Sequence, residues 1–367
     1  MGPVAKLLAD KRVVVVCGAG GVGKTTTSAS LALAAARAGK RVLVITIDPS
    51  KRLAQTLGVS PNEPHPNALP VARQRSVGIE GEGSLSAWML DPQAVSDQTV
   101  RRVSNDAAAA DLLLGNRIYR HITSVIAGMQ EYTAVEALHG FVEDDAYDLV
   151  VLDTPPSRDA LRFLDAPSRA ASFLDARVFR LFVPGSKNPI RQAATKTVER
   201  LLDFAFGAEA RRELQQFFRH FEEIFAYLNR NQHAMQSFLR SDHVSFLLVT
   251  SPAPEALEEA RYFEERARAL SLPLAGYLLN RSIAYADGRP MPSPALVSGS
   301  ASAIEARALD KLAALAEAEA LRARRHAEIL AELRDRAGSG FACAVPELPS
   351  EASDLEALVS LADQFGS

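Results

Sequence analysis

The sequence has very little cysteine and lacks long apolar runs. Its 367 residues include only two cysteines, Cys17 and Cys343, and no C-x-x-C pair, which excludes a disulfide framework and an ordinary zinc clasp. No apolar run approaches the roughly 20 residues of a membrane span, and charged residues interrupt the N-terminal apolar runs, unlike a signal peptide. We therefore expect a cytoplasmic protein whose cysteines pack as small buried apolar groups.

Positive and negative charges are nearly balanced, with 41 lysines and arginines against 44 aspartates and glutamates. The formal net charge is −3 and the pI is about 6.2, so the composition gives no reason to expect nucleic acid as a partner. Hydrophobic residues make up 47% of the chain, which is enough to form a sizeable core. This length fits one large α/β domain with an insertion as well as two domains.

What the sequence does contain is a phosphate-loop motif near its start. Residues 18–26 are Gly-Ala-Gly-Gly-Val-Gly-Lys-Thr-Thr, which fits G-x-x-x-x-G-K-[ST] between a β-branched strand at 13–16 and an alanine-rich helix at 27–37. Glycines let backbone N–H groups surround phosphates, above the positive end of the helix. The motif predicts that Lys24 reaches the β- and γ-phosphates of a nucleotide and that Thr25 ligates Mg²⁺.

Two aspartates follow buried-type strands elsewhere in the chain. Asp153 follows the apolar run 149–152; it is either a solvated strand-end acid or, as we expect beside a phosphate loop, a Mg²⁺ ligand acting through water. Asp48 follows the run 43–47 and could orient or deprotonate an attacking water, although an Asp-Pro pair can also simply begin a turn. Because ligands bind at the carboxyl ends of strands in an open α/β sheet, both aspartates are expected near the loop.

Strands that alternate with helices predict an α/β fold with a doubly wound, mostly parallel sheet of the P-loop NTPase type. Residues 60–83 are expected to form a loop, and 92–142 have a mostly helical pattern. A helical block at 168–240 interrupts the alternation. We therefore expect a P-loop ATPase domain at 1–167 and 241–367, and an inserted helical subdomain at 168–240 with part of 92–142.

The helical block is unusually rich in phenylalanine, and its mixed three- and four-residue spacings permit two interpretations. They fit the core of a subdomain, which we favour, or an apolar groove for a client or partner. The Ala/Glu/Arg-rich segment 304–336 is expected to form a solvated outer helix or helix pair. The phenylalanines of the block are Phe173, Phe179, Phe182, Phe204, Phe206, Phe217, Phe218, Phe221, Phe225 and Phe238.

Three segments together resemble the ArsA-type ATPases, a deviant-Walker branch of the SIMIBI P-loop class that is related to MinD and ParA. They are the double glycine at 20–21, the Asp-Pro pair at 48–49 and the Asp-Thr-Pro-Pro segment at 153–156. The family includes arsenite-pump ATPases and ATPases that target tail-anchored membrane proteins. The resemblance runs over the nucleotide domain, roughly residues 11–58, 147–167 and 244–281, and more weakly over 341–355.

This resemblance implies roles for individual residues. Asp48 would activate the attacking water and share the catalytic role with Lys24, while Asp153 would hold Mg²⁺ together with Thr25. Asn280, at the end of a strand, would bind the adenine of ATP or ADP, and the segment from Pro346 would cover the base. The loop residues that would bind the phosphates and Mg²⁺ are Gly20, Gly21, Val22, Gly23, Lys24, Thr25 and Thr26.

Some features depart from the family pattern. The family normally has a lysine at the position of Ala19, which reaches the nucleotide of the partner subunit, and alanine cannot supply that charge. Lys51, Arg52 and Arg158 are candidate substitutes, although each is more simply part of a solvated basic face. The two isolated cysteines fit neither the zinc pair of targeting members nor the metalloid site of arsenite pumps. Met235 alone in the helical block gives little support to a methionine-lined client groove.

The sequence therefore predicts a Mg²⁺-dependent, ATP-hydrolysing dimeric switch whose nucleotide state is coupled to a helical subdomain. The dimer would be a homodimer or a heterodimer with a related ATPase. One alternative is a targeting or chaperone module that binds hydrophobic segments of a protein client or membrane partner through that subdomain. Another is a catalytically weak ATP-binding subunit of a heterodimer. A small-molecule kinase is disfavoured because both aspartate segments suit hydrolysis.

Overall fold

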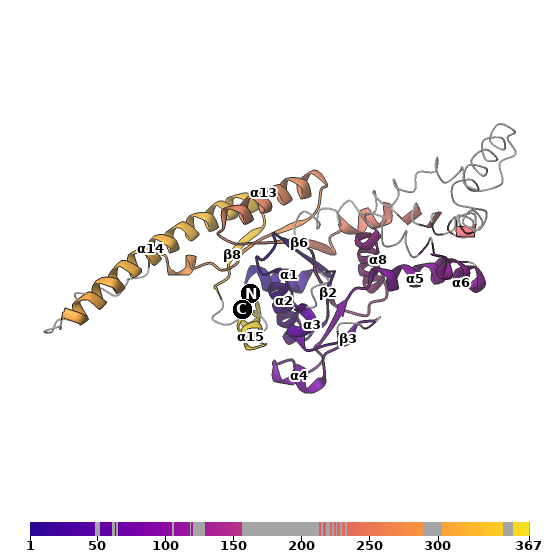
Figure 1. Ribbon diagram of the computed structural model, residues 1–367, viewed down its shortest axis with the longest axis horizontal. Coiled ribbons are helices and arrows are strands. Elements are labelled where there is room, and N and C mark those ends of the chain that lie inside the picture. Colours follow the sequence, from indigo (N-terminus) through magenta and orange to yellow (C-terminus); the bar gives the residue numbers. More distant parts are fainter. Residues whose placement is uncertain are drawn as a thin grey trace.

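The computed structural model describes residues 1–47, 52–60, 63, 65–104, 106–117, 119, 129–155, 213, 216–217, 221, 224, 226–227, 230–231, 233–288, 303–347 and 355–366. The described strands form one eight-stranded sheet in the order β3-β4-β2-β5-β1-β6-β7-β8 (Figure 1). Neighbouring strands are parallel except for β3 and β4, which confirms the predicted fold class. The strands are β1 (Val13–Gly18), β2 (Arg41–Thr46), β3 (Asn67–Ala68), β4 (Ser84–Met89), β5 (Leu149–Asp153), β6 (Val244–Thr250), β7 (Leu274–Leu279) and β8 (Phe341–Ala344).

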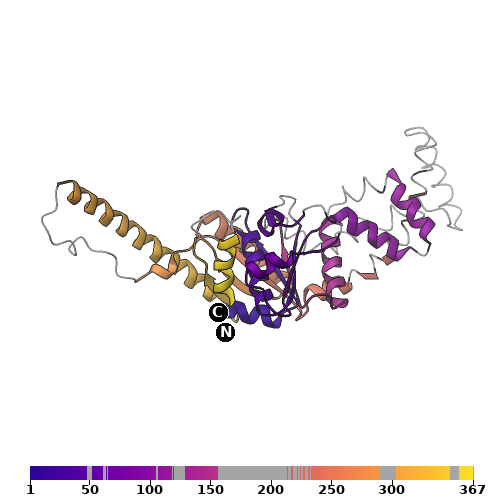
Figure 2. The ribbon, with the colours of Figure 1, turned by 90° about the horizontal axis from the view of Figure 1, so that it is seen from below.

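Helices cover both faces of this sheet, and the molecule is elongated. The long α14 projects beyond the sheet at one end, and α5 and α6 extend at the other (Figures 1 and 2). The described helices are α1 (Pro3–Asp10), α2 (Lys24–Arg37), α3 (Arg52–Leu57), α4 (Val71–Ser76), α5 (Pro92–Val103), α6 (Ala107–Gly115), α8 (Met129–Glu143), α13 (Pro254–Ala269), the 3₁₀ turn η1 (Ala284–Ala286), α14 (Ala303–Ala337) and α15 (Leu355–Gly366).

The sheet is doubly wound around β1. From β1 the chain continues to β2, places β3 at the edge of the sheet and β4 between β3 and β2, returns to place β5 between β2 and β1, and then adds β6, β7 and β8 on the other side. The direction of strand addition thus reverses at β1. In α/β sheets such a reversal leaves a crevice at the carboxyl ends of the strands, which is where ligands bind.

Burial on both faces explains the unbroken apolar run of β1. Val13, Val15 and Cys17 belong to the hydrophobic cluster on one face of the sheet, and Val14 and Val16 belong to the cluster on the other. Side chains of a strand alternate between faces, so a central parallel strand covered by helices on both sides must be apolar throughout. Cys17 is buried as expected, whereas Cys343 in β8 is only partly buried.

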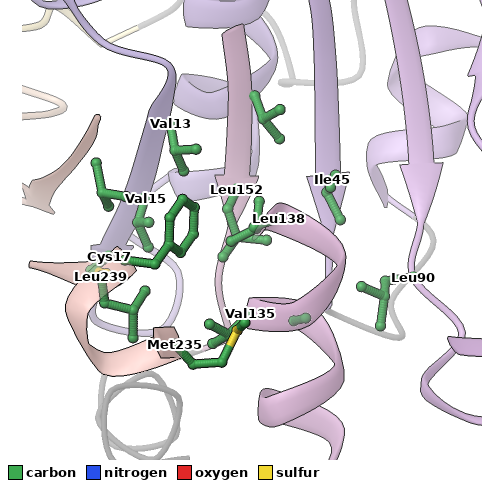
Figure 3. Packing of buried hydrophobic residues seen from close by; sticks show 14 of the residues in the cluster. Val13, Val15, Cys17, Ile45, Leu90, Val135, Leu138, Leu152, Met235 and Leu239 are labelled. Carbon is green, nitrogen blue, oxygen red and sulfur yellow. The ribbon is translucent and has the colours of Figure 1, made fainter. Parts of the chain in front are cut away.

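Helix α8 and the segment that contains Met235 and Leu239 pack directly on the sheet. Figure 3 shows Val135 and Leu138 of α8, together with Met235 and Leu239, against Val13, Val15, Cys17 and Leu152 of the strands. Phe217, Phe221 and Phe238 are also buried in this cluster, so for these described phenylalanines the core interpretation holds. The other seven phenylalanines of the 168–240 block lie outside the described residues, as does most of that block.

The prediction that 60–83 is a loop is wrong in part, because the segment contains β3 and α4. The side chain of Gln74 fixes α4 to the sheet: its Nε2 donates to the carbonyl of Leu69 (2.7 Å), and its Oε1 accepts from the N–H of Leu85 (3.2 Å). A helix of six residues is too short to show a period in the sequence. Helix α1 was not predicted either.

Segment 304–336, predicted as a helix or helix pair, is the single helix α14. It is not solvated throughout, because its C-terminal half buries Ala323, His326, Leu330 and Leu333. No described helix combines the length and apolar character needed to cross a bilayer.

A buried ion-pair cluster joins α13 to α14. The carboxylate of Glu264 in α13 is 1% exposed and lies 2.6 Å from the guanidinium of Arg336 in α14 and 2.5 Å from that of Arg268. The hydrogen bonds that Arg336 donates to this carboxylate raise the pKa of its guanidinium. A carboxylate this deeply buried requires such partners. The cluster therefore fixes the helices that cover β7 and β8.

Gly276 allows β7 and β8 to approach each other closely. A Cβ added there would lie 2.0 Å from the carbonyl oxygen of Phe341, and the φ of +155° also disfavours a side chain.

We predict that Gly276→Ala lowers the free energy of unfolding by about 3 kcal/mol, measured by urea denaturation. Gly140→Ala in α8 is the matched control, because no atom lies near its added Cβ. Equal stability of the two variants would contradict this explanation.

Candidate functional site

The loop between β1 and α2 has the backbone that its glycines predict. Gly21 and Gly23 adopt positive φ values of 75° and 93°, which side chains disfavour. At Gly18 an added Cβ would lie 2.0 Å from the carbonyl oxygen of Val249 in β6. The loop therefore begins at a point of close contact between β1 and β6. The first turn of α2 contains no acidic residue, so the positive end of the helix is not neutralised there.

Lys24, the first residue of α2, turns back into this loop. Its side chain is buried, and its Nζ donates to the carbonyl oxygen of Ala19 at 2.8 Å. An ammonium group must have hydrogen-bond acceptors when it is buried. The carbonyl oxygen of Ala19 supplies one such acceptor. Ala19 is itself buried, with 6% of its surface exposed, in the cluster that contains Val22.

Asp153, at the end of β5, lies at the centre of the site and is fully buried. Its Oδ2 accepts from the hydroxyls of Thr25 (2.7 Å) and Thr46 (3.1 Å), and its Oδ1 lies 3.4 Å from the hydroxyl of Ser28. These hydroxyls come from α2 and from the end of β2. The predicted meeting of Thr25 with Asp153 is therefore present in the geometry, and the carboxylate joins three segments.

Two further residues that contact this carboxylate, Thr46 and Ser28, were not predicted from the sequence. Thr46 is paired in register with Asp153, and Ser28 lies one turn after Lys24; both are buried. A serine or threonine in an apolar run gives no specific signal. The only usable clue was that Thr46 ends a strand beside the predicted site.

A further contact that was not predicted links the residue after β5 to β1, next to the site. Thr154 donates from its hydroxyl to the carbonyl oxygen of Val16 at 2.8 Å, which ties the segment after β5 to β1. Burial raises the pKa of the neighbouring Cys17 thiol to about 12. Cys17 is therefore a neutral packing residue at physiological pH and offers no thiolate for chemistry or metal binding.

The donor set fits Mg²⁺ bound together with a phosphate. Mg²⁺ prefers oxygen ligands and keeps several waters, so sites that use one or two carboxylates plus substrate phosphates are usual. The hydroxyl of Thr25 and the carboxylate of Asp153 supply two adjacent oxygens beside the phosphate loop. Among the described residues, no group of three or more His, Cys, Asp or Glu side chains could hold a metal ion by itself.

Asn280 lies on the other side of the loop. Its Nδ2 donates to the carbonyl oxygen of Val22 at 2.7 Å. The segment after β8 runs alongside, since Ser282 N–H donates to the carbonyl of Val345 (2.9 Å). Pro346, the next residue, is partly buried and lies at the same end of the sheet.

The remaining predicted residues divide into two groups. Gly20 and Gly21 are exposed at the loop surface, and Thr26 is partly buried in the first turn of α2. Asp48 lies outside the described residues, as do Lys51 and Arg158, and the side chain of Arg52 is not described. The end of β2 is fixed beside the site, because the hydroxyl of its last residue, Thr46, contacts Asp153.

Residues 11–283 match the family model described as anion-transporting ATPase. This match covers more than half of the chain. The chain belongs to this family. Membership confirms the resemblance that the phosphate loop and the two aspartate segments indicated.

Individual relatives agree with this assignment. The chain is 33% identical over 163 residues to ATPase ASNA1 homolog 1 of Paramecium tetraurelia, covering 42% of this chain and 43% of the relative. It is 32% identical over 160 residues to ATPase get3 of Aspergillus terreus, covering 43% of each chain. It is 23% identical over 251 residues to a putative arsenical pump-driving ATPase 1 of Aquifex aeolicus, covering 68% of this chain and 58% of that protein. The chain thus spans about half the length of these relatives.

The hydrogen bond from the Thr46 hydroxyl to Asp153 can be tested by substitution. Thr46→Val removes one hydroxyl donor from Asp153 at nearly constant volume, and loss of a group that orients a metal ligand typically weakens metal binding by about 10- to 100-fold. We therefore predict that the Mg²⁺ concentration required for half-maximal ATP hydrolysis rises by about tenfold.

Thr250→Val is the matched control for this experiment. Thr250 is equally buried at the end of β6, and its hydroxyl lies 3.5 Å from the carbonyl oxygen of Ser251. An unchanged Mg²⁺ dependence in Thr46→Val, or an equal change in both variants, would show that Thr46 does not orient the carboxylate.

Proposed function

We propose that this chain binds ATP with Mg²⁺ and hydrolyses it. The observation that carries the proposal is the contact between Thr25 and Asp153 at the N-terminus of α2, directly beside the buried Lys24. Phosphates at this position would meet backbone N–H groups, the positive end of a helix and one ammonium group. Mg²⁺ held by Thr25 and Asp153 would neutralise charge on the β- and γ-phosphate oxygens.

Hydrolysis requires a group that positions water on the far side of the γ-phosphate. Asp48 follows Thr46, the last residue of β2, by two positions in the sequence, so chain connectivity alone keeps the two Cα atoms within about 7 Å of each other. The hydroxyl of Thr46 contacts Asp153. We propose that Asp48 orients the attacking water and accepts its proton. Lys24 and the loop N–H groups would stabilise the charge that develops on the transferred phosphoryl group.

We propose that the working form is a dimer, as the family resemblance implies. The lysine that would cross such a dimer is replaced by Ala19, and Ala19 is packed inside the apolar cluster rather than exposed. A cation in trans can contribute about 10³ to 10⁵ in rate. We therefore propose that another cation supplies this charge or that the chain turns over slowly; Lys51, Arg52 and Arg158 remain the candidates from the sequence.

Nucleotide state would be transmitted to the helical region through the sheet. We propose that 1–167 and 241–367 form the ATPase domain, and that 168–240 with part of 92–142 forms a helical subdomain. Support comes from α8 and the segment with Met235 and Leu239, which pack on the same strands that end at the site (Figure 3). A hydrophobic client groove gains no support from the described phenylalanines, because they are buried.

Lys24→Ala tests the nucleotide site. The substitution removes the ammonium group that would bind the phosphates, so we predict weaker ATP binding and a fall in ATP hydrolysis of about 10²-fold or more. Phosphate release and nucleotide titration measure the two effects. Lys311→Ala, at an exposed position of α14, is the control and should match the unmodified protein. Unchanged turnover in Lys24→Ala would refute the assignment of the loop.

Asp48→Asn separates binding from hydrolysis. An amide of the same shape cannot accept a proton from water, so we predict that ATP affinity stays within about twofold while turnover falls by about 10²-fold. Asp310→Asn, an exposed aspartate of α14, controls for the change in net charge. Parallel loss of affinity and turnover in Asp48→Asn would instead point to a structural role of Asp48.

A further inference from the structure

The side-chain amide of Asn280 is hydrogen-bonded through both its nitrogen and its oxygen. Its Nδ2 donates to the carbonyl oxygen of Val22 (2.7 Å), and its Oδ1 accepts from the backbone N–H of Arg281 (2.9 Å). These partners fix the orientation of the amide, because a flip would place its oxygen against the Val22 carbonyl. Arg281 adopts a φ of +55°, which is uncommon for a residue with a side chain.

The position of Asn280 is itself rigid. Its backbone N–H donates to the carbonyl oxygen of Thr250 at 2.8 Å, which links the ends of β6 and β7. The next residues are held as well: Ser282 N–H binds the carbonyl of Val345, and Ile283 N–H binds Nδ1 of the buried His326 in α14 (3.1 Å). The side chain of Asn280 therefore extends from a fixed framework toward a loop of glycines.

The loop packs closely against this amide. A Cβ added at Gly23 would lie 2.3 Å from Nδ2 of Asn280, and the φ of Gly23 is +93°. In a trans peptide the C=O of one residue and the N–H of the next point in opposite directions in one plane. Holding the Val22 carbonyl toward Asn280 therefore directs the Gly23 N–H away from Asn280. Backbone N–H groups are the groups by which such a loop binds phosphate.

We propose that Asn280 is a positioning residue for the phosphate loop: its hydrogen bond to the Val22 carbonyl holds the loop in the conformation that binds a triphosphate. This role goes beyond a contact with the adenine, because the bond joins Asn280 to the loop itself. The inference rests on the proposed nucleotide site. Its consequence is that loss of Asn280 weakens binding of the phosphate chain even when the ligand has no base.

Inorganic tripolyphosphate distinguishes the two roles, because it has the phosphates of ATP and nothing for a base-binding residue to contact. We propose to titrate tripolyphosphate and ATP, each with Mg²⁺, into the full-length protein and into Asn280→Ala and Asn280→Asp by calorimetry. Both substitutions leave the Val22 carbonyl without its donor. We expect the affinity for tripolyphosphate to fall by about tenfold, and the affinity for ATP to fall by at least as much.

Controls separate this inference from the proposed function. Asn67→Asp makes the same chemical change in β3, at the opposite edge of the sheet from β8, and should leave both affinities unchanged. Tripolyphosphate binding that Lys24→Ala abolishes would establish the phosphate site itself. If that site binds but Asn280→Ala reduces only ATP affinity, Asn280 acts on the base alone and the inference is overturned. If the unmodified protein binds neither ligand, the proposed function and the inference fall together.

A second measurement covers the case in which Asn280→Asp does not fold. Hydrogen exchange of the loop amides in nucleotide-free Asn280→Ala should be at least about tenfold faster than in the unmodified protein, with exchange in β6 unchanged. The unchanged β6 amides would show that the sheet is intact. Equal loop exchange in both proteins would show that the bond to Val22 does not hold the loop.

Discussion

The buried carboxylate of Asp153 is the constraint on which the geometry of the site depends. A fully buried charge is unfavourable unless hydrogen bonds replace its lost water. Here the donors are the hydroxyls of Thr25, Thr46 and Ser28. They belong to segments that are distant in the sequence, so satisfying one carboxylate brings the ends of β2 and β5 to the first turns of α2. The crevice at the switch point thereby becomes a defined site rather than only a gap between strands.

The phosphate loop is held from two opposite sides. On one side Thr25 contacts Asp153 of β5, and on the other Val22 accepts from Asn280 after β7. The second contact depends on the far half of the sheet, where Gly276 allows β8 to approach β7 and the Glu264 cluster fixes α13 and α14. Elements that contribute no ligand thus determine where a loop some 250 positions earlier in the chain is held.

The sequence predicted this fold well because its strongest signals are local. An apolar strand, a glycine-rich loop and a helix are adjacent in 13–37, and Asp153 directly follows its strand. The contacts of Thr46 and Asn280 were not predictable in the same way. Each joins a common polar side chain to a partner that only the strand order brings near, so no spacing in the sequence indicates it. Helix α4 was missed because six residues cannot display a helical period.

Ala19 shows how packing restricts the chemistry available to the loop. Its side chain lies in the apolar cluster, while its carbonyl accepts the ammonium of Lys24. The loop therefore supplies a hydrogen-bond acceptor to its own lysine. The same packing means that a longer side chain at position 19 would have to leave this cluster to reach solvent, so position 19 as it stands contributes no charge to the site.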